Sequence, residues 1–361
     1  MERLKSVWRE NMAKKPAKDE QFNYASELRT LMERGPERLY FLWGPEDYLR
    51  EQYLVQLKKK CLPEGEDDFS YKRLDGPALD ALRLQQAVDA MPFMTERTFV
   101  ELRDVDINKL SDPDACMKII CDIPDYCTVV FIQSTEFDPD GRLRFIKTLR
   151  SEGREIKFTP QSQGMLTDWI ARRFAAAGKG IELSAAQRLI FISGDLMSRL
   201  IPEIEKIAAY AKGDKVTQED VEAVANHIPE AVVFEMTELI ANKKNNSALS
   251  VLSELLSDKN NEPIMMLAVL GKQMRQLYAA RLALDKNLGT KYVMETCTIK
   301  YDYIASKLIS AARGFTLPQL KRAVELCCET DYRMKSSGIE ERELLKEVVL
   351  RIAAGESYAA N

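Results

Sequence analysis

Apolar and polar positions alternate in two different ways along this chain. Up to about residue 160, short apolar runs rich in aromatic and β-branched residues are separated by stretches with helical spacing. Runs of this kind, bounded by turn residues, are typical of strands. The clearest are "LYFLW" (39–43), "RTFVELRD" (97–104) and "CTVVFIQS" (127–134), with weaker candidates at 69–76 and 155–160. Because strands that alternate with helices usually pair in parallel, we predict a three-layer α/β domain over residues 21–162.

Helical spacing dominates the rest of the chain, where strand signals largely stop. Four short helical patterns predict a small helical domain over residues 163–230. Residues 231–361 are predicted to form a second helical domain, in which one apolar stripe contains Met266, Leu270, Met274 and Leu277. The first 20 residues are polar, and we expect a loosely ordered N-terminal extension there. The predicted fold class is therefore α/β plus all-α.

Composition narrows the classes of protein to consider. The 361 residues are 45% hydrophobic and 30% charged, which is enough for two or three domains with apolar cores. The formal net charge of -4 argues against a surface that coats nucleic acid, although it leaves room for a local basic patch. No signal peptide is recognisable, and no stretch reaches the roughly 18 apolar residues of a membrane span. We expect a cytoplasmic protein without membrane contact.

The seven cysteines and the single histidine do not suggest a metal site. No C-x-x-C pair occurs, and one histidine cannot complete a usual Cys/His zinc set. Most of the cysteines lie inside apolar patterns, so we expect small buried thiols in a reducing compartment. His227 falls at a predicted helix end, where a capping or surface role is expected rather than catalysis.

A glycine turn follows the first predicted strand in the position of a phosphate-binding loop. A P-loop has the pattern G-x-x-x-x-G-K-[ST] between a strand and a helix. Counting from Gly44 places Leu49 at the second glycine, Arg50 at the lysine and Glu51 at the hydroxyl residue. The lysine that would reach the phosphates is missing, and acids bring like charge toward them. We therefore expect no nucleotide, no metal and no other cofactor at this degenerate loop.

Other stretches of the sequence agree with the loss of a nucleotide site. Arg103 and Asp104 end a predicted strand where a metal-binding acid would be expected, so a cation replaces that acid. The stretch "SGDLMSRL" (193–200) resembles the segment of AAA+ proteins that carries a sensor arginine, and Met197 falls at that arginine, although Arg199 is close by. The alternative is an ordinary strand–turn–helix junction whose acids complement the helix N-terminus. Both interpretations predict that the strand, turn and helix keep their arrangement although no nucleotide binds there.

An α/β domain followed by a small helical lid resembles the layout of AAA+ ATPases. A third helical domain behind the lid resembles the layout of clamp-loader subunits. In particular, the chain resembles the delta subunit of the bacterial DNA polymerase III clamp loader from about residue 22 onward. The resemblance rests on four stretches in the same order and spacing as in that family, at residues 38–54, 89–105, 193–225 and 233–282.

This resemblance implies a subunit without ATPase activity that binds the sliding clamp (beta) and opens its ring during DNA replication. The third domain would form a collar with gamma/tau-type and delta-prime-type subunits, around primed DNA in the assembled complex. ATP would act on the neighbouring subunits. The chain would thus belong to the DNA polymerase III holoenzyme, a nucleotidyltransferase, without being its catalytic part.

The family's clamp contact falls on apolar residues between the second predicted helix and the strand after it. By position these are Met91, Phe93 and Met94. The helix is expected to stop at Met91, because Pro92 disfavours helical geometry in the residue before it. Many family members carry Leu-Phe at the last two positions, where this chain has Phe-Met. The alternative is that Phe93 and Met94 fold back onto their own core.

Two other functions compete with this interpretation. An active AAA+ ATPase or helicase loader would need a working P-loop, and Leu49, Arg50 and Glu51 speak against one. A purely structural member of the ring, similar to the delta-prime subunit, would be expected to carry a Ser-Arg-Cys motif, and the sequence has none.

Overall fold

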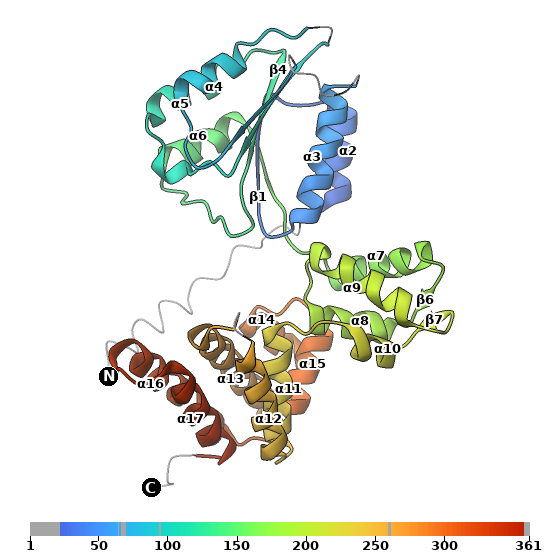
Figure 1. Ribbon diagram of the computed structural model, residues 1–361, viewed down its shortest axis with the longest axis vertical. Helices are drawn as coiled ribbons and strands as arrows, with labels where there is room; N and C mark the ends of the chain where they lie inside the picture. Colours follow the sequence, from blue (N-terminus) through green and yellow to red (C-terminus); the bar gives the residue numbers. More distant parts are fainter. Residues whose placement is uncertain (1–21, 64, 66–69, 94, 259–260, 357–361) are drawn as a thin grey trace. The chain divides into compact units, whose positions relative to one another are not determined.

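The computed structural model describes the chain except for residues 1–21, 64, 66–69, 94, 259–260 and 357–361. The predicted N-terminal extension and Met94 therefore lie outside the described residues. The chain divides into two compact units, Met1–Gln161 and Ser162–Asn361 (Figure 1). The further division of the second unit into a lid and a collar stays a prediction.

The first unit is built on a five-stranded parallel sheet with the strand order β2-β3-β4-β1-β5. Its strands are β1 (Leu39–Trp43), β2 (Tyr71–Asp75), β3 (Thr98–Arg103), β4 (Cys127–Ile132) and β5 (Arg154–Lys157). All residues of β1 and β4 are buried, as expected for parallel strands covered on both faces. The sheet confirms the predicted α/β architecture.

Helices cover both faces of this sheet and complete three layers (Figure 1). On one face lie α2 (Tyr24–Arg34) and α3 (Asp47–Cys61). On the other lie α4 (Ala81–Val88), α5 (Pro113–Cys121) and α6 (Arg144–Glu152), with the short 3-10 turn η1 (Ile107–Lys109) between β3 and α5. The main apolar cluster joins this second face to the strands and includes Phe41, Leu84, Val100, Phe131 and Ile146.

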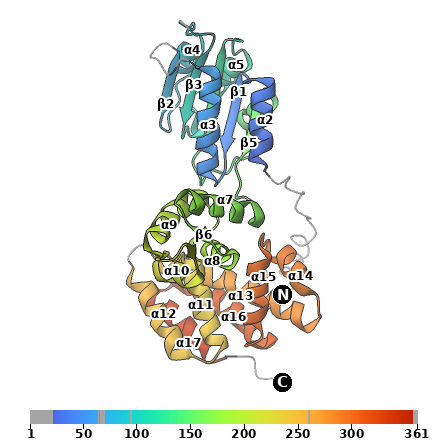
Figure 2. The same cartoon turned by 90° about the vertical axis from the view of Figure 1, so that its right-hand side faces the viewer.

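The second unit is almost entirely helical (Figure 2). Its first part holds α7 (Gln163–Ala176), α8 (Leu183–Ser193), α9 (Met197–Tyr210) and α10 (Gln218–Val224). Two strands of two residues each, β6 (Gly180–Ile181) and β7 (Lys215–Val216), pair in parallel between these helices. Nothing in the apolar pattern predicted them, because two residues are too few to show a period.

The rest of the second unit surrounds one long helix, α13 (Pro263–Asp285). Around it lie α11 (Pro229–Ala241), α12 (Asn245–Ser257), α14 (Gly289–Cys297), α15 (Asp302–Ala312), α16 (Leu317–Ser336) and α17 (Glu341–Ala353). The predicted apolar stripe of Met266, Leu270, Met274 and Leu277 is buried inside this bundle. That stripe therefore holds the unit together and is not itself a surface for other proteins. No helix among the described residues has the length and apolar character of a membrane span.

Candidate functional site

The turn after β1 is required by the packing of the backbone. Gly44 has a φ of +117°, and a Cβ atom placed there would lie 2.4 Å from the carbonyl oxygen of Phe158. The same carbonyl accepts a hydrogen bond from the N–H of Glu46 at 3.1 Å. Any side chain at position 44 would collide with the backbone that follows β5. The glycine is thus explained by the fold, whether or not a phosphate ever approaches it.

Arg50, at the position of the P-loop lysine, is turned back into its own loop. Its side chain is buried, and its Nη1 donates a hydrogen bond to the carbonyl oxygen of Gly44 at 2.8 Å. Burial lowers the pKa of this guanidinium, while the nearby carboxylates of Glu51 and Asp47 act in the opposite direction. Leu49, at the position of the second P-loop glycine, is buried beside it. The Arg50 guanidinium, which could have bound a phosphate, therefore binds a carbonyl of its own loop.

Glu51 forms a two-point ion pair with Arg103 of β3. Arg103 Nη1 and Nη2 donate to the two carboxylate oxygens of Glu51 at 2.9 and 2.8 Å. These hydrogen bonds to the Glu51 carboxylate raise the pKa of the Arg103 guanidinium above its ordinary value. The alternative interpretation expected acids of the loop to complement the helix N-terminus. Asp47 does so, because its Oδ1 accepts a hydrogen bond from the N–H of Tyr48 at 2.9 Å.

Glu101 extends this pair into a buried group of charges that also includes Lys58 and Tyr71. Its carboxylate is fully buried and forms an ion pair with Arg103. Lys58 Nζ lies 2.6 Å from Glu101 Oε2, and the Tyr71 hydroxyl donates to the same oxygen at 2.8 Å. Burial acts to raise the pKa of Glu101, but the three hydrogen bonds outweigh it and hold the pKa below its ordinary value. We call Glu51, Lys58, Tyr71, Glu101 and Arg103 the Glu101 network.

The Glu101 network lies on the strand where a metal-binding acid was considered, and it joins β2, β3 and α3. Its carboxylates are matched by the cations of Arg103 and Lys58, so the charges are balanced inside the protein. Sequence reasoning identified Glu51 and Arg103 but missed Glu101, Lys58 and Tyr71. The available signal was Glu101 itself, since a carboxylate in an otherwise apolar strand requires a partner.

The segment between α4 and β3 presents apolar side chains to solvent. The helix ends at Val88, three residues before the predicted stop, so Met91 lies in the loop and not on the helix stripe. Met91 is 75% exposed and Phe93 is 57% exposed. The exposure of Phe93 favours the predicted contact with a partner over packing into the core of this chain, and the assignment stays a prediction. Met94 falls outside the described residues, so neither interpretation can be applied to it.

Hydrogen bonds hold the backbone of this segment at its base. Ser70, which precedes β2, donates from its hydroxyl to the carbonyl oxygen of Phe93 at 3.3 Å and lies 2.7 Å from the hydroxyl of Thr95. Thr95 in turn donates to the carbonyl oxygen of Arg97 at 3.0 Å. A backbone that is already held in place has less conformational entropy to lose when its side chains bind a partner. This arrangement is suited to protein contact.

The structure also places the other residues that the sequence singled out, namely Met197, Arg199, His227 and the cysteines. Met197 is buried at the start of α9, and Arg199 is exposed. His227 Nε2 lies 3.6 Å from a carboxylate oxygen of Glu222. All seven cysteines are free thiols, of which Cys61, Cys116, Cys127 and Cys327 are buried, Cys297 is half-buried, and Cys121 and Cys328 are exposed. Across the described part of the chain, no three His, Cys, Asp or Glu side chains gather as metal ligands.

Comparison with known proteins gives consistent matches. The family model "DNA polymerase III, delta subunit" matches residues 40–159, and "DNA polymerase III delta subunit, C-terminal domain" matches residues 230–352. DNA polymerase III subunit delta of Bacillus subtilis is 23% identical over 324 residues, covering 86% of this chain and 91% of that protein. A probable DNA polymerase III subunit delta of Aquifex aeolicus is 24% identical over 311 residues, covering 82% and 86%.

One solved structure has a similar fold over the whole length of its chain. It is the DNA clamp loader delta protein of Bacillus subtilis, with a TM-score of 0.51 and 20% sequence identity. The match covers 92% of this chain and 100% of that one.

Proposed function

Because the chain belongs to the delta-subunit family of DNA polymerase III and so has a role in clamp loading, we propose that it binds the sliding clamp (beta) and opens its ring. The observation that carries this proposal is the exposure of Met91 and Phe93 on a loop whose backbone is held by Ser70 and Thr95. Burying one such side chain in a partner contributes about 1.5–3 kcal/mol. Two of them are enough for the energetic centre of a protein interface.

The subunit performs this task without binding nucleotide. The Arg50 guanidinium is bound to the Gly44 carbonyl, and Arg103 is bound to Glu51 and Glu101. A triphosphate at this loop would have to displace Arg50 from the Gly44 carbonyl, or Arg103 from Glu51, before either guanidinium could offset its charge. ATP would therefore act on neighbouring subunits and control access to the clamp-binding loop.

The helical bundle after residue 230 contributes the assembly surface. It would form a collar with gamma/tau-type and delta-prime-type subunits, and primed DNA would pass through the assembled complex in the cytoplasm. Large apolar side chains remain exposed on this bundle although its main stripe is buried. Met265 is 58% exposed and Tyr332 is 71% exposed. Side chains of this kind are candidates for contact with other subunits.

Co-elution with the purified clamp in gel filtration tests the proposal. Wild-type protein is mixed with the clamp of the same organism, once without nucleotide and once with Mg-ATP. We expect a stable complex of the same size and yield in both runs. A complex that forms only with Mg-ATP would contradict the nucleotide-independent part, and the absence of a complex in both runs would contradict clamp binding.

A further inference from the structure

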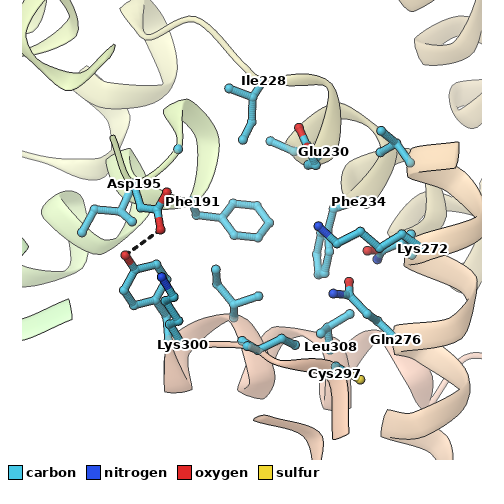
Figure 3. A pocket seen from close by; sticks show the side chains of 18 of the residues that line it. Phe191, Asp195, Ile228, Glu230, Phe234, Lys272, Gln276, Cys297, Lys300 and Leu308 are labelled. Carbon is cyan, nitrogen blue, oxygen red and sulfur yellow. Dashed lines mark hydrogen bonds between the residues drawn. The ribbon is translucent and has the colours of Figure 1, made fainter. Parts of the chain in front are cut away.

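A cavity in the second unit lies between α8, α11, α13 and α15 and has no part in the function proposed above (Figure 3). Its volume is about 330 Å³. Cavities that bind small ligands range from about 300 to 1,000 Å³, so this one has room for a molecule of one or two rings. Its walls are mainly apolar, with Phe191, Phe234, Ile228 and Leu308 around the centre (Figure 3).

The walls of this cavity are already fixed by contacts within the protein. The rings of Phe191 and Phe234 meet edge to face, with centroids 5.0 Å apart and an interplanar angle of 86°. On another side the Tyr301 hydroxyl donates a hydrogen bond to Asp195 Oδ2 at 2.9 Å. Gln273, buried in α13, donates to the hydroxyl of Thr237 in α11 at 3.3 Å. A ligand would therefore enter a cavity that needs little rearrangement.

The charges around the cavity favour an anion. Four charged side chains line it, the carboxylates of Asp195 and Glu230 and the ammonium groups of Lys272 and Lys300. The Asp195 carboxylate accepts the Tyr301 hydroxyl, and Glu230 lies in the first turn of α11, where the helix dipole stabilises a negative charge. In the part of the chain that the structure describes, neither lysine forms an ion pair.

Lys272 and Gln276 extend from α13 toward Phe191 and Phe234, so their nitrogen donors face the apolar centre (Figure 3). Lys272 is exposed and Gln276 is half-buried, so together they can hold a carboxylate at the edge of the cavity by a charge-assisted and a neutral hydrogen bond. We propose that this cavity is a binding site for a small aromatic monoanion, with its ring against the touching pair Phe191 and Phe234 on one side and Leu308 on the other, and its carboxylate at Lys272 and Gln276. The site does not depend on clamp binding.

Fluorescence titration of the full-length protein with three probes of one shape tests the site. The probes are 2-naphthoate, the neutral 2-naphthalenemethanol and the cationic 2-naphthylmethylamine. We expect saturable binding of one naphthoate per chain, with a dissociation constant below about 1 mM. The alcohol should bind about tenfold more weakly, because a charge-assisted hydrogen bond is lost, and the amine more weakly still.

Two variants on the same helix locate the binding. Lys272→Met should reduce naphthoate affinity to that of the alcohol and leave the alcohol unaffected. Arg275→Met is the matched control, because Arg275 is an exposed cation of α13 that does not line the cavity. It should leave all three affinities unchanged, and melting temperatures verify that both variants fold. Absence of saturable naphthoate binding, equal affinity for acid and alcohol, or equal losses in the two variants would each overturn the proposal.

Discussion

Arg103 of β3 holds both carboxylate oxygens of Glu51 of α3, at 2.9 and 2.8 Å, across a separation of 52 residues in the chain. From the sequence, Arg103 was predicted to stand where a metal-binding acid would be and Glu51 at the position of a P-loop hydroxyl. Their pairing ties β3 to α3. The pair thus has a structural role of its own.

Arg103→Met should therefore destabilise the protein. The variant leaves the fully buried Glu101 carboxylate with Lys58 and Tyr71 as its hydrogen-bond partners from the Glu101 network. Breaking a buried ion pair costs about 3–5 kcal/mol, and we expect about 2 kcal/mol here because the Arg103 side chain is 21% exposed. Urea unfolding measures the change. Arg142→Met, which breaks the surface pair with Asp140, should leave the midpoint unchanged, and equal shifts in both variants would contradict the account.

The contribution of Glu101 should depend on pH. The pKa of its carboxyl is lowered in the folded protein relative to the ordinary value of 4.5. A carboxyl of this kind stabilises the fold above its unfolded pKa, and the contribution is lost as pH falls through the folded value. The difference in unfolding free energy between wild type and Glu101→Gln should be constant near neutrality and shrink below about pH 4.5. A difference that grows on acidification would show that the pKa shift has the opposite sign.

Mg-ATP should not bind with a dissociation constant below about 100 μM, which corresponds to roughly 5.5 kcal/mol. Arg50→Lys should not create binding either, because Leu49 and the carboxylates of Asp47 and Glu51 remain. Isothermal titration calorimetry measures the binding of Mg-ATP to the wild type and to Arg50→Lys. Saturable heat from the wild type would mean that the hydrogen bond from Arg50 to Gly44 does not close the loop. Saturable heat from Arg50→Lys would mean that Leu49 and the two carboxylates do not prevent binding.

A fragment of residues 1–161 should retain clamp binding and lose co-purification with other loader subunits. A cut at residue 230, the predicted lid–collar boundary, is less suitable because it separates Phe191 from Phe234, whose rings are 5.0 Å apart. The compact unit ends at Gln161, so the shorter fragment is cut at the boundary between the two units. Pull-down with the clamp and, separately, with the other subunits measures the two activities. A folded fragment that binds neither would contradict the assignment of clamp binding to this unit.

The sequence was sufficient for features that depend on local pattern. The runs at β1 and β4 predicted buried strands, and the spacing from Gly44 to Glu51 predicted a loop without a P-loop lysine. It was insufficient for contacts between residues that lie far apart in the chain, because no periodic pattern of apolar residues relates Glu101 to Lys58 and Tyr71. It also extended the helix to Met91, because Pro92 is the first residue that disfavours it, although the helix ends at Val88.

The most direct test of the central claim is one double variant, Met91→Ala with Phe93→Ala, measured for clamp affinity and for melting temperature. Leu82→Ala is the control, because Leu82 is 64% exposed on the neighbouring helix α4. If Met91 and Phe93 bind the clamp, the double variant should lose at least about 2 kcal/mol of binding free energy and keep its melting temperature, while the control keeps both. A strongly lowered melting temperature with unchanged clamp affinity of the folded protein would contradict the clamp-contact assignment.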